Sequence, residues 1–119
     1  METGSKACIL RIYLSSTDRF RHSLLSETIV FAAKRYKLAG ATVFRGTMGF
    51  GGSSVIHSQK FWEISGKMPV VVEITDDEAS IEKFLGIILP WFDKIPTGCL
   101  ITRQEAEVVL IKKGHKKKF

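Results

Sequence analysis

Four apolar segments of the chain have the hydrophobic pattern of β-strands. Residues 7–14 form a short, apolar and partly β-branched run bounded by the polar residues 15–18, which predicts a strand whose buried face carries Cys8, Leu10, Ile12 and Leu14. Shorter apolar runs predict strands at residues 41–45 and 68–74, the second with a proline at its start, where a missing N–H is tolerated. The last apolar segment, residues 99–111, predicts one strand, or two short ones interrupted near residues 103–105.

Two further segments have the apolar spacing of helices. The first helix is expected over residues 23–38, with Gly40 as its C-terminal stop and an apolar face made of Leu25, Ile29, Ala32, Ala33 and Tyr36. The second follows residues 75–78, whose sequence is typical of a capping box from Thr75 to Glu78. Its apolar stripe is Ile81, Phe84, Leu85, Ile88 and Leu89, and Pro90 and Pro96 are expected to mark its end.

The order strand, helix, strand, strand, helix, strand predicts the fold class. It is an α+β, ferredoxin-like βαββαβ fold, with an antiparallel sheet and two helices on one face. The length of 119 residues predicts a single domain over residues 1–119, with its core in residues 7–111 and a basic tail at 112–119. The other face of the sheet needs cover, so self-association is expected through the candidate apolar positions Tyr13, Phe44, Val71 and Val109.

Charge and cysteine usage narrow the classes of function. The tail supplies five of the 18 basic residues, and the other 13 nearly balance the 12 acidic ones. A solvated terminus is therefore favoured over a nucleic-acid-binding arm. Cys8 and Cys99 lie in apolar runs and form no CxxC pair, which favours two buried thiols. The chain has no signal-peptide pattern at its start and no apolar run long enough to span a membrane, so a cytoplasmic location is expected.

A glycine-rich segment after the second expected strand is the main candidate for binding chemistry. It contains Gly46, Gly49, Gly51 and Gly52, and Arg45 stands at its entrance. Backbone N–H groups of such a segment can turn toward a phosphate without hindrance from Cβ atoms. The segment completes neither a P-loop nor a dinucleotide fingerprint, so a mobile loop or hairpin and an anion site both stay open.

Candidates for catalysis and for metal binding are few. The three histidines, His22, His57 and His115, are scattered, and no nucleophile can be paired with a base, so no catalytic residue and no metal ligand is assigned. The acidic residues 76–78 are explained by capping. Trp91 is expected to pack at the end of the second helix, whereas Phe61 and Trp62 stay open between anchoring and base stacking.

Several segments of the chain resemble one known family. These are residues 10–13, 41–46 and 69–74, and above all Gly49-Phe50-Gly51-Gly52-Ser53-Ser54 with Ile56-His57. Over residues 7–111 the chain resembles the uncharacterised PII-like proteins of bacteria and archaea, a family of unknown function related in fold to the PII signalling proteins.

The resemblance implies a homotrimer with its sheets facing inward and a non-enzymatic role in signal transduction. It implies an ADP, ATP or AMP site in clefts between subunits, with no required cofactor. The nucleotide-binding residues would be Arg45, Gly46, Gly49, Gly51, Gly52 and Arg103 or Lys112. The loop that contacts an unidentified target protein would carry Met48, Phe50, Ser53, Ser54 and His57. The segment lacks the Gln-Lys-Gly pattern and the modified tyrosine of true PII proteins, which argues against nitrogen signalling and 2-oxoglutarate binding.

The alternative reading is a divalent-metal-responsive trimer of the cation-tolerance type, which shares this fold. It would use His57, with Cys8 or Cys99, at subunit junctions. The sequence identifies neither the physiological ligand nor the target protein, nor does it establish the order of residues 46–58 or the role of the basic tail.

Overall fold

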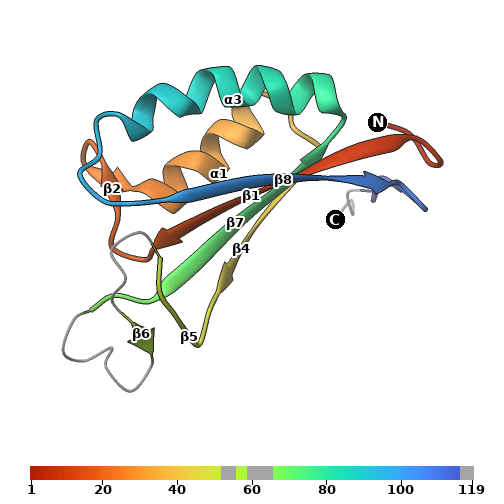
Figure 1. The fold of residues 1–119 in the computed structure, drawn as a ribbon. Helices are drawn as coiled ribbons and strands as arrows, with labels where there is room; N and C mark the ends of the chain where they lie inside the picture. Colours follow the sequence, from red (N-terminus) through yellow and green to blue (C-terminus); the bar gives the residue numbers. More distant parts are fainter. Residues whose placement is uncertain (52–55, 59–65, 116–119) are drawn as a thin grey trace, which may run out of the picture.

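In the computed structural model, which describes residues 1–51, 56–58 and 66–115, two helices cover one face of a four-stranded sheet (Figure 1). All neighbouring strands are antiparallel, and their order is β4-β7-β1-β8. This arrangement confirms the predicted ferredoxin-like α+β fold. The strands of the sheet are β1 (Lys6–Ser15), β4 (Gly40–Arg45), β7 (Pro69–Asp76) and β8 (Leu100–Glu107), and the helices are α1 (Leu25–Arg35) and α3 (Glu78–Phe92).

Two short ribbons lie outside the main sheet. β2 (Arg19–Phe20) pairs with β3 (Ser23–Leu24) just before α1, and β5 (Met48–Gly49) pairs with β6 (His57–Ser58). The glycine-rich segment is therefore not a plain loop, because part of it forms a β-ribbon. The predictions for Gly52, Ser53, Ser54, Phe61 and Trp62, and those for the end of the tail, concern residues outside the described part of the chain.

The hydrophobic core lies between the sheet and the two helices. The predicted buried face of β1 is confirmed, because Leu10 and Ile12 have no exposed surface and Cys8 and Leu14 are buried. The register places Leu10 opposite Ile74 and Ile12 opposite Val72, so β1 and β7 present one continuous apolar surface. The helices cover it with Leu25, Ile29, Ile81, Phe84 and Ile88, all fully or almost fully buried.

Helix α1 begins and ends inside its predicted bounds. Residues 23 and 24 belong to the β2–β3 ribbon, so the helix starts at Leu25. At its C-terminus Leu38 N–H donates to the Ala33 carbonyl and Lys37 N–H to the Lys34 carbonyl, with Lys37 at φ 63°. This is a Schellman motif with lysine at the left-handed position. The prediction that Gly40 stops the helix was wrong, because Gly40 is the first residue of β4.

Helix α3 has a different N-cap from the predicted one. β7 continues through Thr75 and Asp76, so the cap is Asp77, whose carboxylate accepts a 2.8 Å hydrogen bond from Ser80 N–H. That backbone hydrogen bond, and after it the side-chain hydrogen bond of Ser80, lowers the pKa of the Asp77 carboxyl from its ordinary value of 3.8. The capping residue therefore lies two positions after the predicted Thr75.

The C-terminal half of α3 also corrects the sequence prediction. Pro90 lies inside the helix, which ends at Phe92. A proline near the last turn removes one hydrogen bond close to where the ladder ends anyway, so the helix can continue for two residues beyond it. Leu89 is exposed and does not belong to the buried stripe, whereas Ile81, Phe84 and Ile88 do.

The last strand is continuous. β8 pairs with β1 without a break from Leu100 opposite Tyr13 to Glu107 opposite Lys6, so no interruption occurs at residues 103–105. The strand ends at Glu107, and residues 108–111 follow it without strand structure. Cys99 lies just before β8 and is exposed, contrary to the prediction that both thiols are buried.

Candidate functional site

The base of the glycine-rich segment is fixed where β4 leaves the sheet. Arg45 is the last residue of β4 and is exposed. Gly46 N–H donates a 2.8 Å hydrogen bond to the Pro69 carbonyl, and a Cβ atom at position 46 would lie 2.9 Å from Pro69 Cγ. Glycine is therefore required here for close packing against Pro69. In this conformation the Gly46 N–H is used within the subunit and does not point to an external anion.

The described part of the segment beyond Gly46 is open to solvent. Met48 and Phe50 are both largely exposed, and Gly49 pairs with His57 through the backbone of β5 and β6. Gly51 has no atom within 4 Å of where a Cβ would stand. Met48 on β5 and Phe50 directly after it are exposed apolar side chains that are suited to contact another protein.

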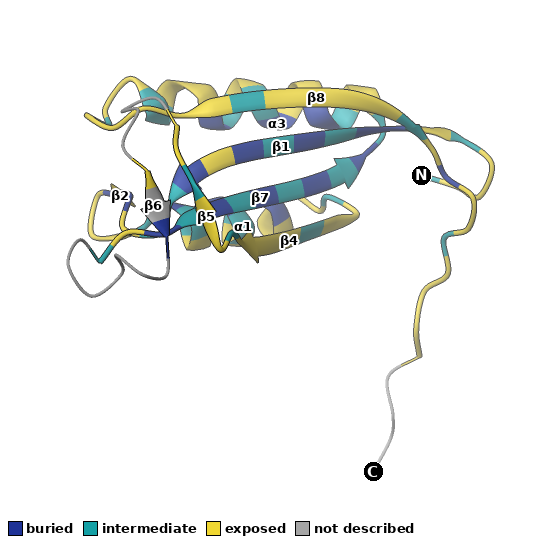
Figure 2. Ribbon diagram, turned by 60° about the horizontal axis from the view of Figure 1, so that its bottom comes forward, coloured by how far each residue is buried: buried dark blue, intermediate teal, exposed yellow. Residues whose placement is uncertain are grey.

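Arg103 lies far from this base within one chain. It is on β8, which forms the opposite edge of the sheet from β4, and β7 and β1 lie between them (Figure 2). The register pairs Arg103 with Leu10, so its side chain is on the helix-covered side, where it forms an ion pair with Glu82 of α3. Lys112 lies beyond the end of β8 and is exposed. A single subunit therefore does not bring Arg45 and Arg103 together.

The open face of the sheet carries an apolar row that crosses all four strands. Cross-strand pairing places Phe44 opposite Val71, Val71 opposite Tyr13, and Tyr13 opposite Leu100. Phe44, Tyr13 and Leu100 are 50%, 40% and 56% exposed although they lie within strands. Val109, the fourth residue predicted for this face, is highly exposed but lies beyond β8.

A polar row runs beside the apolar one, and sequence reasoning missed it. Arg11 Nε donates to Glu73 Oε2 at 3.0 Å and Arg11 Nη1 to Gln104 Oε1 at 2.6 Å. Thr42 and Thr102 lie at the two ends of this row. The alternation of Arg11 and Glu73 with apolar neighbours in the sequence was the signal that could have revealed it, given the strand pairing.

The two cysteines cannot serve one metal site within a subunit. Cys8 pairs with Glu105 near one end of the β1–β8 ladder, whereas Cys99 precedes Leu100 at the other end. About six residues of strand separate them, which is roughly 20 Å. Among the described residues no group of three or more His, Cys, Asp or Glu side chains is arranged to hold a metal ion.

Trp91 packs as predicted at the end of the second helix. Its ring stacks on Phe20 with centroids 5.0 Å apart and an interplanar angle of 14°. In the described part of the chain, neither helix is long and apolar enough to cross a membrane.

Solved structures of PII-like proteins share this fold. CPII, a nitrogen regulatory PII-like protein from Thiomonas intermedia K12 bound to ADP, AMP and bicarbonate, superimposes with a TM-score of 0.65. It is 14% identical, and the match covers 87% of this chain and 89% of that one. A chain from Thermus thermophilus, assigned to the PII-like signaling proteins, has a TM-score of 0.60 at 17% identity, over 87% of this chain and 90% of its own.

Sequence comparison gives the family. A UPF0166 protein from Aquifex aeolicus is 35% identical over 106 residues, which is 89% of this chain and 96% of the relative. A UPF0166 protein from Methanocaldococcus jannaschii is 38% identical over 80 residues, 67% of this chain and 73% of the relative. The model of the DUF190 family, described as "Uncharacterized ACR, COG1993", matches residues 7–108. The chain therefore belongs to the DUF190 (UPF0166) family and shares its fold with the PII-like proteins.

Proposed function

We propose that this chain is a non-enzymatic, PII-like regulatory protein of the cytoplasm. It forms a homotrimer, binds an adenine nucleotide between subunits and contacts a target protein through its glycine-rich segment. The observation that carries the proposal is the position of Arg45 and Arg103 on the two opposite edges of the sheet. A ring of subunits places one edge of each sheet beside the other edge of its neighbour, so both guanidinium groups can face one ligand only across a subunit boundary.

The open sheet face supports the assembly. Side chains of Tyr13, Phe44 and Leu100 leave an apolar row in water on an isolated subunit, and the chain's own helices cover only the other face. Packing these rows together in the centre of a trimer removes that surface from water, at about 25 cal/mol per Å² of apolar area. The Arg11–Glu73 ion pair beside the row satisfies charges that would otherwise be buried unpaired.

The proposed nucleotide site is supported by the charge of two arginines and by a structural neighbour that was solved with nucleotides bound. Arg45 and Arg103 can each donate paired hydrogen bonds to phosphate oxygens. Arg103 has to leave Glu82 to do so, which is a modest cost for an exposed ion pair. CPII, which shares the fold, was solved with ADP and AMP bound, and this supports ADP, AMP or ATP as the ligand class.

The proposed partner surface is supported by exposed apolar residues next to the nucleotide site. Met48 and Phe50 are exposed apolar residues that follow directly after the Arg45–Gly46 base. A phosphate bound at the base would bias the conformation of the segment that begins there, and this difference would regulate contact with a target protein. The resemblance adds Ser53, Ser54 and His57 to the proposed contact segment.

The direct test is a thermal-shift titration with ADP, AMP and ATP on the wild-type protein and on Arg45→Ala. The expected result is a nucleotide-dependent rise in melting temperature that Arg45→Ala loses. Lys34→Ala removes an exposed charge from α1 and is expected to keep the wild-type response. An equal response in the wild type and in Arg45→Ala would refute the proposed site, and so would no response to any of the three nucleotides.

A further inference from the structure

We propose that the groove between α1 and the C-terminal end of α3 docks an acidic polypeptide segment of a partner protein, one that also carries an apolar side chain. This surface is on the helix side of the molecule, away from the open sheet face. The proposal adds a second contact surface and stands whether or not the nucleotide site exists.

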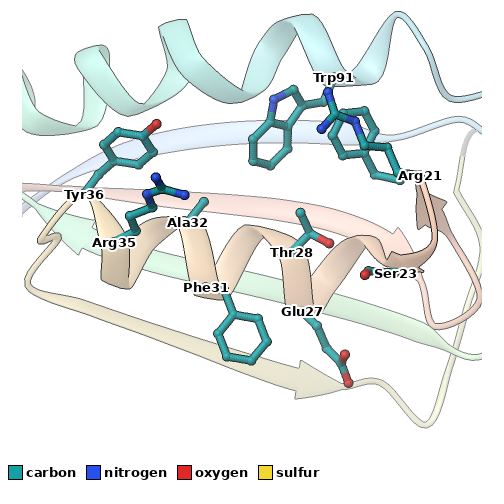
Figure 3. A pocket seen from close by; sticks show the side chains of 10 residues that line it. Arg21, Ser23, Glu27, Thr28, Phe31, Ala32, Arg35, Tyr36 and Trp91 are labelled. Carbon is teal, nitrogen blue, oxygen red and sulfur yellow. The ribbon is translucent and has the colours of Figure 1, made fainter.

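The groove has a volume of about 430 Å³ and is built from three elements. Figure 3 shows Arg35 of α1 and its C-cap residue Tyr36 at one end, and Arg21 of the β2–β3 turn with Trp91 of α3 at the other. Thr28 and Ala32 line α1 between these two ends. Two guanidinium groups therefore flank a strip of aromatic and small side chains, an arrangement that suits carboxylates on both sides of an apolar anchor.

The backbone at Arg21 is strained in a way that favours a role for its side chain. Arg21 and His22 form the two-residue turn between β2 and β3, and of these two only Arg21 has a positive φ, 59°. This first position of such a turn favours glycine. An arginine there keeps its guanidinium carbon 5.1 Å from the centre of the Phe20 ring, which itself stacks on Trp91. The strained residue thus holds a cation at the groove, as strained residues often do at binding sites.

The charge around the groove selects an acidic partner. Residues 19–37 contain five basic side chains and one acidic one, Glu27. The rest of the chain before Lys112 has eight basic and 11 acidic residues, so the positive charge before the tail is concentrated in residues 19–37, of which Arg21, Arg35 and Glu27 line the groove. The chain's own C-terminal tail is basic and would be repelled from the groove.

The shape of the groove selects a polypeptide over a small molecule. Small-molecule sites usually enclose most of the ligand surface. Here Phe31 and Tyr36 are 70% and 49% exposed, and Arg21, Glu27 and Arg35 are exposed as well. An open surface with exposed aromatic residues and arginine is typical of the anchor regions of protein interfaces.

The test uses a short synthetic peptide that alternates Glu with Leu and carries one Phe, and a twin peptide with Lys in place of each Glu. Binding to the full chain is followed by fluorescence anisotropy and by the NMR signal of the Trp91 indole N–H. Arg21→Gly removes the cation and also relaxes the turn, so a melting temperature at or above that of the wild type shows that the fold is intact. Arg35→Gln is the second variant, and Lys34→Gln is the matched control on the same helix.

The expected result is saturable binding of the Glu peptide with a shift of the Trp91 signal, weakened roughly threefold or more by Arg21→Gly and by Arg35→Gln. Lys34→Gln should bind like the wild type, and the Lys peptide should not bind. An affinity for the Glu peptide that is unchanged in both arginine variants would overturn the proposal, and so would the absence of saturable binding. So would binding only to phosphatidylserine vesicles, or self-association that buries Trp91.

A parallel ADP titration separates this proposal from the nucleotide proposal. Arg21→Gly should keep the ADP-dependent thermal shift of the wild type while it binds the Glu peptide more weakly. Peptide binding without any ADP response would leave the groove assigned and the nucleotide site refuted.

Discussion

Gly46 and Pro69 hold the base of the glycine-rich segment against the sheet through one backbone hydrogen bond of 2.8 Å and a contact too close for any side chain at position 46. This contact predicts that Gly46→Ala lowers the free energy of unfolding by about 1–2 kcal/mol, because the new methyl group overlaps the proline ring. Urea denaturation measures the effect.

Gly51→Ala is the matched control for Gly46→Ala, since nothing lies within 4 Å of its Cβ position. It should leave stability nearly unchanged. The double variant Gly46→Ala with Pro69→Ala should cost less than the sum of the two single changes, because it removes the overlapping atoms. Equal costs for the two glycine variants would show that the contact with Pro69 does not matter.

The apolar row on the open sheet face predicts how the protein assembles. Leu100→Glu and Phe44→Glu place a carboxylate in the row at positions that are about half exposed in the subunit. Each should convert the trimer to monomers in sedimentation equilibrium while the circular dichroism spectrum is retained. Leu89→Glu, at a leucine of similar exposure on α3, should leave the trimer intact. A monomeric wild type, or trimers in all three variants, would contradict assembly through the sheets.

The N-cap of α3 predicts a pH-dependent contribution to stability. Hydrogen bonding by Ser80, chiefly from its backbone N–H, lowers the pKa of the Asp77 carboxyl in the folded state. The stabilisation is therefore fully present above the unfolded-state pKa, near 3.8, and is lost as pH falls through the lower folded-state value.

Asp77→Asn isolates the charge of this cap, because asparagine can still accept the Ser80 hydrogen bond. The wild type should be more stable than Asp77→Asn above about pH 4, and the difference should shrink as the carboxyl is protonated. Urea denaturation across a pH series measures it. A difference that stays constant down to the lowest pH would mean that the ionised carboxylate is not what stabilises the helix.

The Arg103–Glu82 ion pair predicts an effect on nucleotide affinity. Because Glu82 competes with a phosphate for Arg103, Glu82→Gln should tighten ADP binding by roughly 1.5- to 5-fold, the range expected for an exposed ion pair of about 0.2–1 kcal/mol. Isothermal titration calorimetry provides the measurement. Asp93→Asn makes the same change in net charge at the other end of α3 and should have little effect. An unchanged affinity in Glu82→Gln would separate Arg103 from the nucleotide site.

Most of the fold could be predicted from the sequence because the periodicity of the core is strong. The apolar run of residues 7–14 and the helical stripe around Ile81 and Phe84 are set by burial, and the structure confirms both. The predictions were wrong where pairing with a neighbouring strand determines at which residue a strand ends and the next helix begins. Thr75 was expected to cap α3, yet pairing with Ile9 of β1 keeps it in β7 and moves the cap to Asp77.

The site could be predicted only in part. The sequence places Arg45 beside the glycines, but it does not reveal that Arg103 lies on the other edge of the sheet, because that follows from strand order. The groove between the helices escaped notice for a similar reason. Arg21, Arg35 and Trp91 are separated along the chain, and only the packing of α1 beside α3 and the β2–β3 ribbon brings them to one surface.

The most direct measurement mixes the variants Arg45→Ala and Arg103→Ala by unfolding and refolding them together, and then counts ADP sites by calorimetry. Each variant alone should bind ADP weakly or not at all. In mixed trimers a boundary between Arg45 of one variant and Arg103 of the other is intact, so random mixing should restore about a quarter of the wild-type sites. Recovery of that fraction is the predicted result. No recovery on mixing, or normal binding by either variant alone, would contradict a nucleotide site shared between subunits.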